Sequence, residues 1–254
     1  MRVFSLIPVA IMCAMAAAHP VEESRSVLVP RDCSAEVTAF NLARREKRGL
    51  SKRTFYSELQ NLTCVAAPET PREDYVATPA IRQDVTEGQV GVPLTLDIGV
   101  IDVTTCQPLP NVMVEVWSPN AQGSYGATFL RGAYTSSSSG IAEFQTIFPG
   151  HTSDSANHIN LMVHTSSSMS GSVSHAGQVF FTDRWTDVIG GGIYYGYKQN
   201  ANSRMMNAQD PNYQLANSAG YNAIVDIEEI GDDWPDGVIG YITVGVNPSR
   251  KVTF

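Results

Sequence analysis

The sequence predicts a mainly β protein, a β-sandwich with an N-terminal helical arm, on three observations. Apolar and polar residues alternate over residues 92–100, which would place Leu94, Leu96 and Ile98 on one face of a strand. About seven strand-like segments follow one another, separated by turn-rich pieces such as 165–174. No convincing long helical pattern lies among them, so two packed sheets are the expected architecture.

The N-terminus has the pattern of a cleaved secretory signal. Met1-Arg2 precedes an almost wholly apolar stretch that runs to Ala18 and ends in small residues. This stretch is shorter than the ~20 residues that span a membrane, and no later segment replaces it. We therefore expect a secreted, extracellular protein without a membrane anchor, with a signal over 1–18, an arm over 19–63 and one domain over 64–254.

The arm is expected to contain a helix over residues 34–53. Val37 and Leu42 are among its apolar positions, and Gly49 is suited to end it. Six basic residues crowd into the part that starts at Arg44. They allow three interpretations, namely a site for polyanions, processing sites at paired basic residues, or a solvated helix face, which the pattern favours.

The rest of the chain is acidic. From residue 55 onward there are eight Lys and Arg against twenty Asp and Glu, and the whole chain has a formal net charge of −8. Such a domain would repel nucleic-acid phosphates, so we expect no nucleic-acid partner.

Cys33, Cys64 and Cys106 remain once Cys13 leaves with the signal. Three cysteines in an oxidising compartment allow one internal disulfide and one leftover thiol. We expect Cys64 to pair with Cys106, because both flank the β-rich region, while every other pairing stays open. Asn61, in Asn61-Leu62-Thr63, is the expected N-glycosylation site.

The segment 158–164 predicts a strand with two different faces. Ile159, Leu161 and Val163 would point into the core, whereas His158 and Asn160 would share the opposite face, because successive side chains alternate. Two ligands at this spacing reach one metal ion, but an amide oxygen is a poorer ligand than an imidazole. Spacing alone favours a hydrogen-bonded, half-buried strand face.

A succession of short motifs covers about residues 64–183. They are Tyr75-Val76, Arg82-Gln83-Asp84-Val85, residues 87–97, Ile101-Asp102-Val103, Thr105-Cys106-Gln107-Pro108, Val114-Glu115-Val116-Trp117, Phe129-Leu130-Arg131-Gly132, residues 144–151, His158-Ile159 and Gly177-Gln178-Val179-Phe180-Phe181. This succession resembles the fungal extracellular intradiol ring-cleavage dioxygenases.

The resemblance implies a β-sandwich that holds one non-haem Fe(III) through two tyrosinates and two histidines. Such an enzyme binds a catechol-type aromatic substrate and uses O2 to open the ring, which gives a muconate-type diacid. By this resemblance the first tyrosine ligand is Tyr125 and the first histidine is His158. Tyr75 matches a tyrosine that lines the pocket, and Gln178 matches a position near the iron.

The sequence departs from the family pattern at the remaining ligands. Thr152 takes the place of the second tyrosine, Asn160 that of the second histidine, and Ser155 that of an arginine near the substrate. Threonine supplies no phenolate, and a carboxamide is a weak substitute for imidazole. Loss of a preorganised positive charge typically costs a few kcal/mol of transition-state stabilisation.

Three hypotheses follow. The favoured one is a repurposed enzyme that keeps the pocket and converts a phenolic or biosynthetic small molecule without iron, which would suit secondary metabolism. The alternatives are a true Fe(III)-dependent intradiol dioxygenase, or a non-catalytic relative that binds an aromatic ligand or a partner. Tyr134, which takes the glutamine place of the family's Arg-Gly-x-Gln motif, is a weaker candidate for a replacement phenolate.

Overall fold

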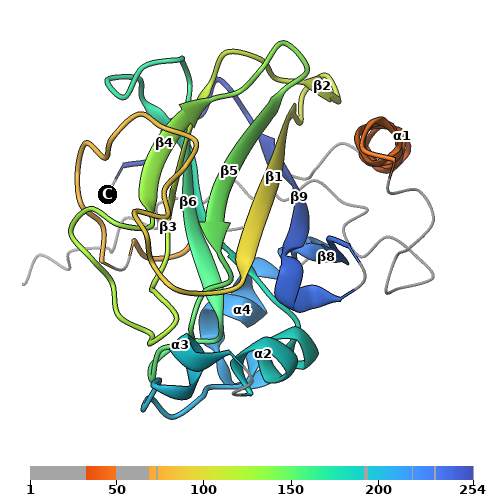
Figure 1. Ribbon diagram of the computed structural model, residues 1–254. Coiled ribbons are helices and arrows are strands. Elements are labelled where there is room, and N and C mark those ends of the chain that lie inside the picture. Colours follow the sequence, from red (N-terminus) through yellow and green to blue (C-terminus); the bar gives the residue numbers. More distant parts are fainter. Residues whose placement is uncertain are drawn as a thin grey trace, which may run out of the picture.

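The computed structural model describes residues 33–49, 69–72, 74–191, 194–218, 220–231 and 233–253. Nine strands form two sheets within these residues, as the β-sandwich prediction requires (Figure 1). Sheet A has the order β4-β3-β6-β7, and sheet B has the order β2-β1-β9-β8 with β5 paired to β1. Sheet A consists of β3 (Met113–Trp117), β4 (Arg131–Thr135), β6 (His158–His164) and β7 (Val173–Phe180). Sheet B consists of β1 (Pro93–Asp102), β2 (Gln107–Pro108), β5 (Ile141–Ile147), β8 (Asp226–Glu229) and β9 (Val238–Val246).

The core lies between the sheets and follows from the alternation in β1 and β6. Leu94, Leu96 and Ile98 of β1 are buried in one cluster with Ile159 and Leu161 of β6. Each such side chain stabilises the fold by about 1.5–3 kcal/mol when it leaves water. The predicted inward face of β6 is confirmed, and His158 and Asn160 lie on the outer face of sheet A.

Two of the strands were not predicted, and a third is longer than expected. β2 is only two residues long, and β4 contains glycine, which weakens the strand pattern. Gly132 is required in β4 because a Cβ there would lie 2.4 Å from Val85 Cγ1. β7 begins at Val173, inside a segment that was expected to be a turn. Its first residues form a strand because they pair with β6 across the sheet.

Short helices gather at one end of the sandwich (Figure 1). They are α2 (Asp183–Gly190), α3 (Tyr195–Lys198) and α4 (Pro211–Ala216). The described residues also contain two short 3-10 helices, η1 (Asn207–Gln209) and η2 (Trp234–Asp236). The Thr182 hydroxyl caps α2 and the Asp210 carboxylate caps α4 by accepting backbone N–H groups. None of the described helices is long and apolar enough to cross a membrane.

The helix of the arm is α1 (Ser34–Lys47), which lies against sheet B (Figure 1). Of its apolar residues, Val37 is buried, whereas Leu42 is exposed. The interpretation of a solvated basic face is wrong for Arg44 and Arg45, which are both buried. Sheet B carries carboxylates on the face that α1 covers, and these neutralise the arginines.

The ion pairs between α1 and sheet B are specific. Arg44 Nη1 lies 2.9 Å from Asp97 Oδ1, and Arg45 Nη2 lies 2.5 Å from Asp226 Oδ2. Arg45 also pairs with Glu228. Because the pairs are buried, removing one partner would leave an uncompensated charge in the interior.

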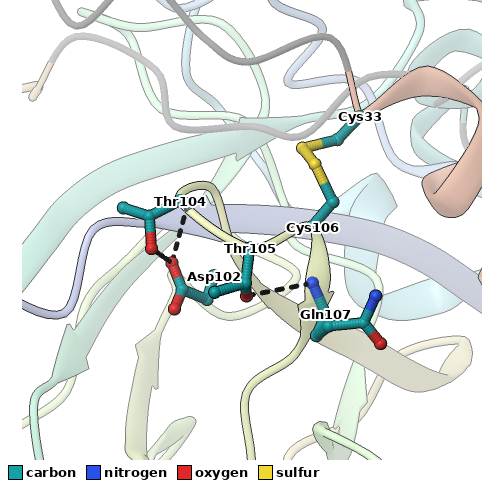
Figure 2. The surroundings of a disulfide bond; sticks show 6 residues. All are labelled: Cys33, Asp102, Thr104, Thr105, Cys106 and Gln107. Atoms are coloured by element: carbon teal, nitrogen blue, oxygen red, sulfur yellow. Dashed lines mark hydrogen bonds between the residues drawn. A yellow bond between two sulfur atoms is a disulfide. The ribbon is translucent and has the colours of Figure 1, made fainter.

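A disulfide joins the start of α1 to the turn after β1 (Figure 2). It links Cys33 to Cys106, so the expected pairing of Cys64 with Cys106 is wrong. The packing of α1 explains why Cys33 is the partner of Cys106, because Cys33, Val37 and Cys106 belong to one buried cluster on the edge of sheet B. Cys64, the glycosylation sequon at Asn61 and the expected signal lie outside the described residues.

Candidate functional site

The outer face of sheet A brings several of the predicted site residues together. His158 and Asn160 come from β6, and Gln178 stands opposite Asn160 on the neighbouring strand β7. Trp117 stands opposite Asn160 on the other side, on β3. The pleat of β6 therefore places three polar side chains and an indole on one surface.

Tyr125 reaches this face from the loop between β3 and β4. Asn120 shapes the loop, because its Oδ1 accepts hydrogen bonds from the backbone N–H groups of Gln122 (3.0 Å) and Ser124 (3.1 Å). Gly123 has φ +76°, and a Cβ there would lie 2.2 Å from the His151 carbonyl oxygen. Tyr125 is thus presented by a closely packed turn.

We call Tyr125, His158, Asn160 and Gln178 the site cluster. The Tyr125 hydroxyl lies 3.2 Å from His158 Nε2 and accepts a hydrogen bond of 3.0 Å from Asn160 Nδ2. Gln178 Nε2 lies 3.0 Å from His158 Nε2 and 3.2 Å from Asn160 Oδ1. The three strand residues are buried, whereas Tyr125 is half-buried.

The His158 ring is held in one tautomer. Its Nδ1 lies 2.7 Å from the Ala156 carbonyl oxygen, which only accepts, so Nδ1 carries the hydrogen. Burial lowers the pKa of His158, although the hydrogen bond to Ala156 and the nearby Asp210 and Asp154 oppose the shift. The Nε2 lone pair therefore faces the cluster and accepts from both Tyr125 and Gln178.

Arg131 adds a positive charge beside Tyr125. Its guanidinium carbon lies 5.7 Å from the centre of the Tyr125 ring, and its Nε donates to the Gly126 carbonyl at 2.5 Å. Burial lowers the pKa of Arg131, and Asp74 and Tyr125 oppose that shift. Arg131 lies within one of the sequence motifs, but the motif alone assigns it no role. Nothing in the motif places its guanidinium over the Tyr125 ring.

Tyr75 lies farther along the same face. Its ring contacts Trp117 edge-on with centres 5.3 Å apart, and its hydroxyl donates to Glu115 Oε2 at 3.4 Å. Burial and the neighbouring Glu115 raise the pKa of Tyr75 to about 12. Tyr75 and Tyr125 both pack against the small cluster that contains Trp117.

Thr152 and Ser155 are the two other departures from the family pattern, and their side chains lie next to each other. The hydroxyl oxygens of Thr152 and Ser155 are 2.8 Å apart and share a hydrogen bond. The positions that the resemblance assigns to a tyrosine ligand and to an arginine therefore hold two neutral hydroxyl groups.

The remaining candidate side chains are engaged elsewhere. His151 Nε2 lies 2.9 Å from the Asn202 carbonyl, and His164 pairs with Glu115. Tyr134 packs against the core cluster between the sheets, on the other face of sheet A from Tyr125. Tyr134 is therefore not placed to replace the lost phenolate.

Comparisons with solved structures agree with the observed fold. An intradiol ring-cleavage dioxygenase from Tetranychus urticae superposes with a TM-score of 0.66 and 24% identity, covering 75% of this chain and 98% of that one. The fold is that of the intradiol ring-cleavage dioxygenases. A second dioxygenase structure gives 0.65 and 25% over 75% and 98% of the two chains. Catechol 1,2-dioxygenase from Acinetobacter sp. ADP1 gives 0.50 and 16% over 87% and 72%. No family model and no curated protein matches the sequence.

The intradiol fold implies a ferric ion, and the site cluster supplies only part of its ligand set. Tyr125 Oη and His158 Nε2 are 3.2 Å apart, close to the ~3 Å between adjacent ligands that bind one ion at about 2 Å. Asn160, however, points its NH2 group at Tyr125, and Gln178 donates to the histidine lone pair that iron would need. The donors do not fit a four-ligand ferric site.

Proposed function

We propose that this chain binds a phenolic small molecule beside Tyr125 and converts it by proton transfer, without iron-dependent ring cleavage. The hydrogen bond between the half-buried Tyr125 hydroxyl and the buried His158 Nε2, at 3.2 Å, carries the proposal. A ligand can contact the phenol of Tyr125, and His158 Nε2, which lies behind it, can take up the proton of that phenol.

The direction of proton movement follows from the hydrogen bonds. The ligand hydroxyl gives its proton to Tyr125 Oη, while the Tyr125 proton passes to His158 Nε2. Gln178 Nε2 then gives up its hydrogen bond to that nitrogen and keeps the one to Asn160 Oδ1. A ligand oxyanion and an imidazolium result, and because burial lowers the pKa of His158, the imidazolium returns its proton readily. The reverse movement delivers a proton to a ring carbon of the ligand, so the net conversion is an isomerisation that needs no co-reactant. Asn160 Nδ2, at 3.0 Å, stabilises negative charge on the Tyr125 oxygen as the proton moves.

Two further groups suit a phenolic ligand. Arg131 places a guanidinium beside the Tyr125 ring, where it would stabilise an oxyanion and substitute for the arginine lost at Ser155. Gln178 Oε1 is buried without a hydrogen-bond partner among the described residues, so it would accept a ligand hydroxyl.

We infer that the protein works outside the cell. The N-terminal sequence has the pattern of a secretory signal, and the Cys33–Cys106 disulfide supports an oxidising compartment. The substrate class follows from the likeness to dioxygenases of catechol-type aromatics and from the aromatic side chains Tyr75 and Trp117 on the same face.

A true ferric dioxygenase is the alternative. The spacing of Tyr125 and His158 favours it, because both could still bind one ion. The proposal predicts conversion that survives chelators and needs no O2, whereas the alternative predicts conversion that consumes O2 and is lost without iron.

The test incubates the purified full-length protein with a panel of catechols and other phenols, with and without chelator and O2, and seeks products, isomers included, by chromatography coupled to mass spectrometry. Tyr125→Phe should reduce conversion at least 100-fold, whereas the matched control Tyr134→Phe should retain it. Conversion that needs iron and O2 would reject the proposal in favour of the dioxygenase. Binding without conversion would favour the non-catalytic relative.

A further inference from the structure

A hollow lies beside the loop that carries Tyr125. It has a volume of about 220 Å³ and is lined mainly by Gln89, Val90, Asn120, Gln122, Tyr195 and Gln199. These residues come from the turn before β1, the loop after β3, and α3 with the residue that follows it. We call this hollow the amide groove.

The walls of the amide groove are preorganised. Tyr197 of α3 is buried, donates its hydroxyl to the Phe148 carbonyl at 2.6 Å and accepts from Val92 N–H at 3.1 Å. Gly196 packs so closely that a Cβ there would lie 3.1 Å from Ala121 Cβ and 3.2 Å from the Val90 carbonyl. A ligand would therefore meet a shaped surface with little to reorganise.

The amides of the groove keep hydrogen-bonding capacity for a ligand. Gln122 Nε2 donates to Gln199 Oε1 at 2.7 Å, which leaves the Gln122 oxygen as an acceptor and the Gln199 NH2 as a donor. Gln89 Oε1 accepts from Asn120 Nδ2 at 3.4 Å, which leaves the Gln89 NH2 group. Neighbouring donors and acceptors of this kind match adjacent hydroxyl groups, because each hydroxyl both donates and accepts.

The groove also offers apolar surface. Tyr195 is 71% exposed and Val90 is 61% exposed, and both line the groove. An exposed aromatic ring beside hydrogen-bonding groups suits a ligand with an apolar C–H face and a polar rim. Among the described residues, none that lines the groove is charged, although the chain carries a net charge of −8. Such a lining suits a neutral ligand.

We propose that the amide groove binds a neutral saccharide, with one sugar ring stacked on Tyr195 and its hydroxyls bonded to Gln122 and Gln199. The proposal does not depend on the chemistry at Tyr125. A neutral sugar unit combines a C–H face with adjacent hydroxyls, and it carries no charge to be solvated. A peptide would instead need a row of backbone donors and acceptors, which side-chain amides on three separate segments do not supply.

The test measures binding of the full-length protein to cellohexaose, xylohexaose and N-acetylchitohexaose by calorimetry and by chemical-shift changes. Polygalacturonate serves as the charged counterpart. At least one neutral oligosaccharide should bind, and Tyr195→Ala and Gln122→Ala should each weaken that binding by about tenfold or more. Gln214→Ala and Leu215→Ala, on exposed positions of α4, are matched controls that should leave affinity unchanged.

Three results would overturn the proposal. They are the absence of binding by any neutral oligosaccharide at millimolar concentration, binding that neither groove substitution weakens, and equal or tighter binding of polygalacturonate. Thermal unfolding of each variant verifies folding, and Tyr195→Phe gives a second variant that should retain binding because it keeps the ring. Loss of the phenol-converting activity in Tyr125→Phe with retained saccharide binding would separate this proposal from the one for the site cluster.

Discussion

The outer faces of the two sheets differ in how their buried polar groups are paired. On sheet B, buried carboxylates pair with buried arginines, whereas around Tyr125 on sheet A neutral hydrogen-bond donors pair with neutral acceptors. The carboxylates of sheet B are covered by α1, whose arginines neutralise them. The site cluster is instead bonded through a phenol, an imidazole and two amides. Tyr125 is half-buried, whereas Arg44 and Arg45 of α1 are buried.

The difference separates a structural surface from a functional one. Sheet B satisfies its charges within the chain and keeps them from solvent, so those charges serve the attachment of the arm. The face of sheet A around Tyr125 has partly exposed aromatic groups and a cation at Arg131, so it can still bind a ligand. Removing residues from sheet B should therefore cost stability, and removing residues from the site cluster should cost function.

The largest loss of stability is expected from Arg45→Ala. It leaves Asp226 and Glu228 buried without their cation, which should reduce the free energy of unfolding by about 3–5 kcal/mol. Urea unfolding measures the loss. Lys47→Ala, on the exposed face of the same helix, is the control and should change stability by less than ~0.5 kcal/mol. Equal effects of the two substitutions would mean that α1 is not held by its ion pairs.

The disulfide is expected to make the next largest contribution. Cys33→Ser should reduce the free energy of unfolding by about 2–4 kcal/mol, because the bridge closes a loop between residues 73 apart in sequence. Peptide mapping without reductant should find Cys33 joined to Cys106. Recovery of a Cys64–Cys106 peptide as the main product would contradict the described pairing.

A pH dependence of about 3 kcal/mol is expected from His175 of sheet A. Burial, helped by Arg250, lowers the pKa of His175 to about 4, against an ordinary value of 6.5. The unfolded chain binds this proton below about pH 6.5 and the folded chain does not, so stability is lost as pH falls toward 4. Urea unfolding at pH 7 and pH 4 should show that His175→Gln loses about 3 kcal/mol less than the native chain. An identical loss in both would show that His175 takes up its proton without cost in the folded state.

The smallest effect on stability is expected in the site cluster. Tyr125→Phe removes one hydroxyl from a half-buried ring and should change the free energy of unfolding by less than about 1.5 kcal/mol. The same substitution should abolish most conversion of the phenolic substrate. A loss comparable to that of Arg45→Ala would show that Tyr125 mainly supports the fold, and the contrast between the two sheets would then fail.

The sequence predicted what depends on local pattern. The alternation in β1 and β6 predicted both the core and the outward direction of His158 and Asn160, because strand faces follow from the pleat. β4 was missed because its glycine is explained only by the approach of Val85, which is distant in sequence. The carboxylates that bury Arg45 come from β8, far along the chain, so the solvated interpretation of α1 could not be corrected from the helix alone.

The motifs predict which residues form the candidate site, but they do not predict the hydrogen bonds among those residues. The sequence identifies Asn160 only as a poor ligand, whereas the structure shows that its NH2 group donates to Tyr125. Arg131 became a candidate only once the loop placed Tyr125 beneath its guanidinium. The disulfide partner of Cys106 likewise depended on where α1 packs.

Iron binding tests the central claim most directly, namely that the site cluster on sheet A forms a neutral hydrogen-bonded network and does not bind a ferric ion. The purified protein is treated with ferric iron, freed of excess, and analysed for iron and for a visible tyrosinate-to-iron absorption band. The Thr152→Tyr and Asn160→His double variant, treated in parallel, restores the family's ligand types and should gain both iron and colour. We predict a colourless native protein with far less than one iron per chain. A stoichiometric, coloured iron complex of the native chain would contradict the account.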